Sequence, residues 1–96
     1  MKQKINEQTK ELIRAIMLLE TEKEYLDFFE DICTIKELQD LSQRFLVAKM
    51  LNDGEKYQKI EEETGASTAT ISRVNKCLVY GSGGYQNVLG KLGELK

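Results

Sequence analysis

The first part of the chain carries apolar residues at the spacing of an amphipathic helix. Over residues 5–20 these positions are Ile5, Leu12, Ile13, Ile16 and Leu19, and charged residues stand between them. An α-helix returns to the same face every 3.6 residues, so the pattern gathers the apolar side chains into one stripe. It predicts a helix from about Ile5 to Glu20.

Two further helices are predicted where a threonine precedes a glutamate by three residues. Thr21 with Glu24, and Thr34 with Glu37, have the spacing of a capping box. In this motif the hydroxyl and the carboxylate bond the free amides of a helix N-terminus. The first box precedes the apolar segment "EYLDFFEDIC", and the second opens an apolar stripe that runs to about Asn52.

The predicted helix after Thr21 is apolar on almost every side. Its large apolar side chains are Tyr25, Leu26, Phe28, Phe29 and Ile32. A chain of 96 residues has little other structure with which to cover so many faces. We therefore expect a second subunit to cover them, which makes the chain a homodimer.

A turn and two short helices are predicted next. "NDGE" at residues 52–55 ends the third helix, with Gly54 suited to a left-handed cap. The short helices span about 56–63 and 68–79 and are joined at Thr64-Gly65-Ala66. A helix-turn-helix places a glycine such as Gly65 in its tight turn because glycine adopts positive φ at little cost.

The apolar positions around Gly65 fit the same motif. Ile60 lies five positions before Gly65, and Ile71 and Val74 lie six and nine positions after it. These three side chains would pack the two helices together, so the opposite face of the second helix would point to solvent. The residues predicted there are Thr68, Ala69, Ser72, Arg73 and Lys76.

This outward face is suited to double-stranded DNA. Small and hydroxyl side chains let a helix enter the major groove, where they contact base edges, thymine methyls or phosphates. Ser67 is placed to cap the helix, whose N-terminus favours a phosphate. The charges agree, because residues 65–96 carry four basic and one acidic side chain, whereas residues 1–64 carry 10 basic and 15 acidic ones.

Other interpretations remain open on the residues alone. A plain helical hairpin has the same apolar spacing, and Glu61 stands four positions before Gly65, where a small residue is usual. The run Glu61-Glu62-Glu63 also places negative charge beside the proposed reading helix. The alternative to a DNA-binding regulator is a helical dimer that binds protein partners, with this acidic face as its contact.

Composition excludes several classes of function. The chain has no histidine, no nucleophile elbow and no convincing phosphate-binding glycine loop, so neither an enzyme nor a metal site is expected. The first residues do not have the pattern of a signal peptide. No apolar run approaches the roughly 20 residues of a membrane span. Cys33 and Cys77, far apart in the chain, are expected to be reduced core thiols of a cytoplasmic protein.

The segments "TIKELQDLSQRFLVAKMLNDGE" and "IEEETGASTATISRVNKCL" resemble the Trp repressor family. Residues 65–73 match its signature Gly-Ala-x-x-Ala-Thr-Ile-[ST]-Arg. The chain also resembles the Trp-repressor-related branch called YerC/YecD, which lacks tryptophan and has a "GSGGY" turn like that at residues 81–85. The resemblance implies an all-α, intertwined homodimer with one helix-turn-helix per subunit.

The resemblance also implies an organisation and a function. Residues 1–96 would form one domain, with dimerisation helices over 1–53, the helix-turn-helix over 54–80, and a glycine turn and C-terminal helix over 81–96. The function would be that of a transcriptional regulator, most simply a repressor. The DNA-facing positions of the family carry over as Ser67, Thr68, Ala69, Thr70 and Ser72.

The resemblance also bears on an effector site. Trp repressors hold the corepressor tryptophan between two arginines, and the matching residues are Arg44 and Arg73. Val74 stands where the family has a glycine against the indole ring, and Cys77 replaces a serine that binds the amino group. L-tryptophan is therefore not expected to bind, which leaves either no effector or a smaller one.

Overall fold

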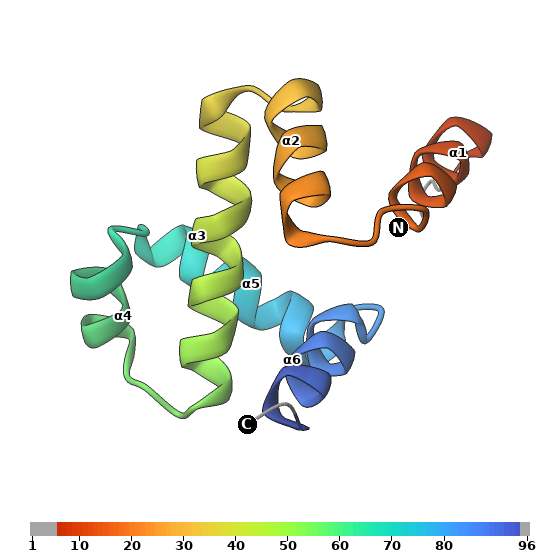
Figure 1. Ribbon diagram of the computed structural model, residues 1–96. Helices are drawn as coiled ribbons and strands as arrows, with labels where there is room; N and C mark the ends of the chain where they lie inside the picture. Colours follow the sequence, from red (N-terminus) through yellow and green to blue (C-terminus); the bar gives the residue numbers. More distant parts are fainter. Residues whose placement is uncertain (1–5, 95–96) are drawn as a thin grey trace. The chain divides into compact units, whose positions relative to one another are not determined.

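The computed structural model describes residues 6–94, and this part of the chain contains helices and turns without a strand. Its helices are α1 (Glu7–Ile16), α2 (Glu22–Ile32), α3 (Ile35–Asn52), α4 (Tyr57–Thr64), α5 (Thr68–Tyr80) and α6 (Gly84–Glu94) (Figure 1). The all-α fold class is confirmed.

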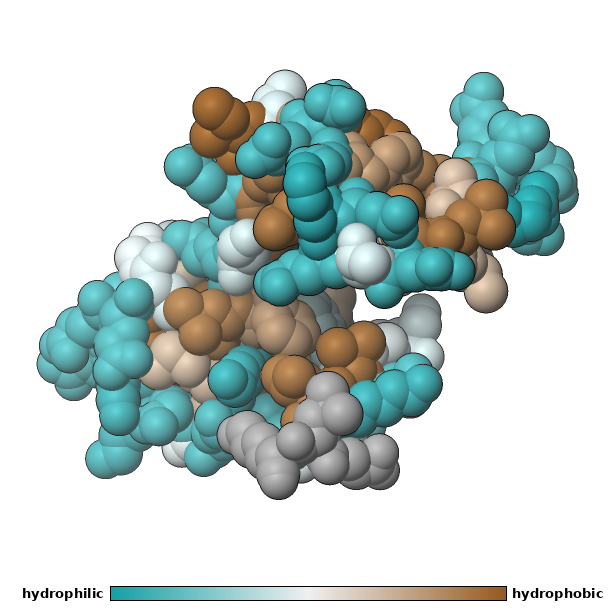
Figure 2. All heavy atoms as spheres, viewed as in Figure 1, coloured by the Kyte–Doolittle hydropathy of each residue, from teal (hydrophilic) through white to brown (hydrophobic). Residues whose placement is uncertain are grey.

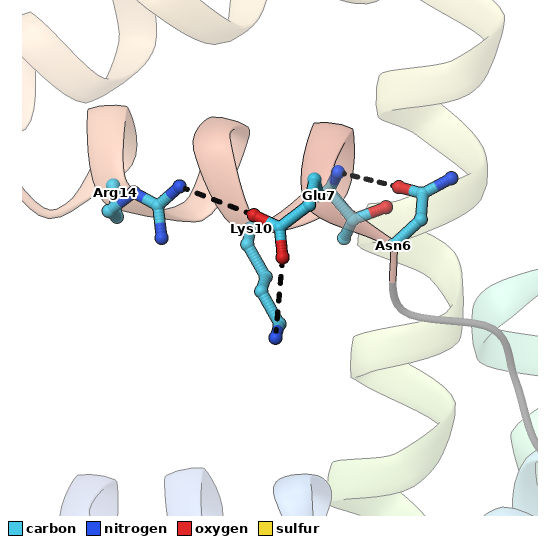
Figure 3. Close-up of polar contacts among 5 residues, drawn as sticks. Asn6, Glu7, Lys10 and Arg14 are labelled. Atoms are coloured by element: carbon cyan, nitrogen blue, oxygen red, sulfur yellow. Dashed lines mark hydrogen bonds and ion pairs between the residues drawn. The ribbon is translucent and has the colours of Figure 1, made fainter.

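Helix α1 begins at a side-chain cap and carries ion pairs along one side (Figure 3). The Thr9 amide donates to Oδ1 of Asn6 at 2.9 Å, and Glu7 lies 3.8 Å from Lys10 and 4.0 Å from Arg14. The helix ends at Ile16, earlier than the predicted Glu20. Beyond Ile16 the amides of Leu18 and Leu19 bond carbonyls three residues back, which closes turns instead of continuing the helix.

Both predicted capping threonines begin helices. At α3 the box is reciprocal, because the Glu37 amide donates to Thr34 Oγ1 at 3.0 Å and the Thr34 amide donates to Glu37 Oε1 at 2.8 Å. At α2 the Glu24 amide donates to Thr21 Oγ1 at 3.2 Å. The Glu24 carboxylate accepts from the Glu20 amide instead of the Thr21 amide, so it fixes the chain that enters the helix.

The chain divides into two compact units between Leu38 and Gln39, within α3. In the first unit α1 and α2 bury no side chain fully. Phe28 and Phe29 are half-buried and meet edge to face, with ring centroids 5.9 Å apart. Figure 2 shows hydrophobic side chains at the surface in view, and Leu18 and Leu26 are 79% and 59% exposed.

The second unit holds the hydrophobic core and contains the helix-turn-helix. Buried side chains from the C-terminal half of α3 pack with those of α4, the turn, α5 and α6: Val47, Ala48, Met50, Ile60, Ala66, Ile71, Val74, Leu78 and Leu89. Helix α3 therefore supports the motif directly. Gly81 then ends α5, where an added Cβ would lie 2.3 Å from the Cys77 carbonyl oxygen.

Candidate DNA interface

The turn between α4 and α5 is fixed by glycine and by hydrogen bonds. Gly65 has φ +74°, and its amide donates to the Glu61 carbonyl at 3.0 Å. Thr64 Oγ1 donates to the Ile60 carbonyl at 2.7 Å and accepts from the Ala66 amide at 3.0 Å. Gln43 Nε2 of α3 donates to the Thr64 carbonyl at 3.1 Å. The turn is thus held by hydrogen bonds within the helix-turn-helix and by one from α3.

Helix α5 has the two faces that the sequence predicts. Ile71 and Val74 are 0% and 2% exposed, and Ile60 of α4 is 0% exposed, so these three residues form the packed side. The predicted DNA-facing residues Ser67, Thr68, Ala69, Ser72, Arg73 and Lys76 are all exposed, whereas Thr70 is half-buried. The structure thus brings most of them to one continuous exposed surface.

Hydroxyl groups at the start of α5 bond to one another and to α4. Ser67 caps the helix as predicted, because its Oγ accepts from the Thr70 amide at 3.1 Å. The same hydroxyl donates to Thr70 Oγ1 at 3.1 Å. Thr68 Oγ1 donates to the Glu61 carboxylate of α4. Sequence spacing did not reveal this last contact, since the two residues lie seven apart on different helices.

The basic side chains of α5 are available to an anion. Within the described part of the chain, Arg73 and Lys76 make no ion pair, whereas Lys59 of α4 lies 3.3 Å from Glu55 and 4.0 Å from Glu63. Lys59 therefore partly offsets the negative charge of Glu63 in α4 and of Glu55, which precedes that helix. The two cations on the exposed face of α5 can therefore bind an anionic partner.

A pocket of about 560 Å³ lies next to the motif and was not predicted from the sequence. Phe45 of α3, Tyr85 and Val88 of α6, and the turn after α5 line it, together with Cys77. The prediction that both cysteines are core thiols is wrong for Cys77, which is exposed, and Cys33 is half-buried. Cys77 follows Val74 by three residues and turns toward the pocket, away from the core.

The predicted effector residues lie on two helices. Arg44 of α3 and Arg73 of α5 are both exposed. Val74 is buried in the core and does not line the pocket.

Among residues 6–94, no cluster of histidine, cysteine, aspartate or glutamate could hold a metal ion. None of the described helices combines the length and the apolar character that crossing a membrane requires.

Comparisons with known proteins agree with this geometry. The family described as Trp repressor protein matches residues 7–93. The uncharacterized protein YerC of Bacillus subtilis (strain 168) is 51% identical over 84 residues, which are 88% of this chain and 81% of YerC.

Two solved structures have the same fold. A TrpR-like protein from Eubacterium eligens ATCC 27750 superimposes with a TM-score of 0.88 at 53% identity, over 92% of this chain and 91% of that one. A candidate Trp repressor from Staphylococcus aureus superimposes with a TM-score of 0.89 at 44% identity, over 96% of both chains.

Proposed function

The chain belongs to the Trp repressor family, and we propose that it is a cytoplasmic, homodimeric regulator that binds specific double-stranded DNA sequences and represses transcription. Its fold is that of a DNA-binding regulator. Helix α5 would enter the major groove, and the two copies of α5 in a dimer would read two half-sites.

The observation that carries this proposal is the exposed face of α5. It combines a capped helix N-terminus, small side chains at Thr68, Ala69 and Ser72, and the cations Arg73 and Lys76, which form no ion pair with any residue of 6–94. Small residues allow close approach to base edges, while the cations bind phosphates and fix the position of the helix. DNA binding by these residues involves no catalytic step.

The test is a genome-wide footprint of the purified protein, followed by titration of an enriched site at several salt concentrations. Arg73→Ala and Lys76→Ala should each weaken binding and reduce the slope of log affinity against log salt concentration by about one. The reason is that a complex with one phosphate contact fewer releases about one counterion fewer when it forms. Lys23→Ala removes an exposed cation from α2 and should leave the slope unchanged.

An empty footprint would contradict the proposal and favour the protein-binding alternative. A footprint whose affinity and sequence preference survive Thr68→Val and Ala69→Ser would show that a different surface contacts the groove.

A further inference from the structure

We propose that Glu61 sets the sequence preference of α5 by holding the Thr68 hydroxyl as a hydrogen-bond acceptor. In this role the Glu61–Thr68 pair selects adenine or cytosine over guanine or thymine at the base that it faces. The inference rests on the proposed DNA-binding function and deepens it.

The Thr68 hydroxyl has a single hydrogen to give. A threonine hydroxyl has one donor hydrogen and two acceptor lone pairs. The hydrogen of Thr68 is directed to Oε2 of Glu61, which accepts it. Thr68 Oγ1 therefore offers only lone pairs to a partner outside the protein. Because Thr68 is exposed as the first residue of α5, those lone pairs are accessible.

The neighbouring hydroxyl behaves in the same way. Ser67 directs its hydrogen to Thr70 Oγ1 at 3.1 Å and accepts the Thr70 amide, so its Oγ keeps one free lone pair. The exposed hydroxyls at the tip of α5 thus form an acceptor surface, with the half-buried Glu61 carboxylate behind it. The Ser67 and Thr68 hydroxyls of this surface cannot donate to a phosphate, and the Glu61 carboxylate repels one. Thr68 is therefore assigned to base edges, while phosphate contacts fall to Arg73 and Lys76.

The major groove gives this surface a defined partner. Adenine and cytosine present an amino group there, whereas guanine and thymine present only acceptors to such a contact. Thr68 Oγ1, held as an acceptor, would accept a hydrogen bond from the amino group of adenine or cytosine. It would make no hydrogen bond with the carbonyl oxygen of guanine or thymine, because both groups would then be acceptors. One hydrogen bond of ordinary net strength corresponds to a preference of roughly three- to tenfold.

The experiment is selection of binding sites from randomised DNA by the wild-type protein and three variants. The wild type should show a three- to tenfold preference for adenine or cytosine at one position of each half-site. Glu61→Ala frees the hydroxyl to donate or accept, and Thr68→Val removes it, so both should reduce that preference below about twofold. Glu62→Ala removes the same charge from an exposed position of α4 and should preserve it.

The outcomes separate this inference from the proposed function. The inference is overturned if the wild type shows no preference for an amino base, or if Thr68→Val does not remove that preference. It is also overturned if the preference survives Glu61→Ala. Each of these outcomes leaves DNA binding intact. No selection by any protein overturns both. Urea unfolding without DNA gives an independent reading, since the shifts caused by Glu61→Ala and Thr68→Val should be non-additive. Additive shifts would show that the two side chains do not interact and would also overturn the inference.

Discussion

At the scale of single residues, Val74 and Cys77 are the positions on which the prediction about tryptophan depends. Val74, on the packed face of α5, fills space that a glycine would leave open, and it is 2% exposed among the core residues. Cys77 offers a thiol, a weak hydrogen-bond partner, where the family has a hydroxyl. Arg44 and Arg73 stand at the matching arginine positions of the family, and both are exposed.

We predict that L-tryptophan does not bind. An indole would have to displace the valine carbons, and overpacking typically costs about 1–3 kcal/mol, which lowers affinity roughly five- to a hundredfold or more. Isothermal titration calorimetry should therefore show no saturable heat. Binding in the micromolar range would contradict the prediction.

Val74→Gly with Cys77→Ser is the matched variant for this measurement. It should gain some tryptophan affinity if the two arginines still form a clamp. Because Val74 belongs to the core, the variant also loses stability, and circular dichroism must first show that it remains folded.

At the scale of elements, the start of α5 depends on one side chain. Ser67 Oγ accepts the Thr70 amide, which would otherwise lack a partner at the helix N-terminus. Ser72 lies exposed within the same helix and caps nothing. The two serines therefore separate the effect of the cap from the effect of changing serine to alanine.

Ser67→Ala should lower the free energy of unfolding by about 1 kcal/mol, because an orphan amide is left. Ser72→Ala should leave it unchanged or raise it slightly, since alanine is the better helix former. Thermal unfolding of the two variants beside the wild type measures the difference. Equal effects would mean that the cap does not stabilise the motif.

The sequence predicted those elements whose signals are local. Threonine and serine caps and the positive φ of Gly65 depend on residues within one or two turns, and the structure has them in place. The end of α1 was misplaced, because apolar periodicity continues past Ile16 although the helix does not. The Glu61–Thr68 contact and the pocket beside Cys77 required knowing how different helices pack, which spacing along the chain does not give.

At the scale of the whole molecule, one chain leaves much apolar surface in water. In the first unit Met17, Leu18 and Ile35 are 74%, 79% and 76% exposed. Burying one such side chain stabilises by about 1.5–3 kcal/mol, so a partner that covers several of them would contribute much of the net stability of a small domain.

We predict that the protein sediments at micromolar concentration with twice its monomer mass of 11.0 kDa. Leu26→Glu should promote dissociation or unfolding, although Leu26 is 59% exposed in the single chain and a change there would be nearly neutral in a monomer. Lys23→Glu changes an exposed position of the same helix and should remain dimeric. A folded wild-type monomer would contradict this prediction.

The close approach of Gly81 to the Cys77 carbonyl oxygen has a consequence for how the turn can diverge among descendants of this sequence. Any other residue at position 81 would bring a Cβ within 2.3 Å of that backbone oxygen, and a backbone atom cannot swing aside as a side chain can. At Gly84, by contrast, an added Cβ would meet nothing within 4 Å. Inherited variation in "GSGGY" is therefore expected to spare the first glycine and to accumulate at the last.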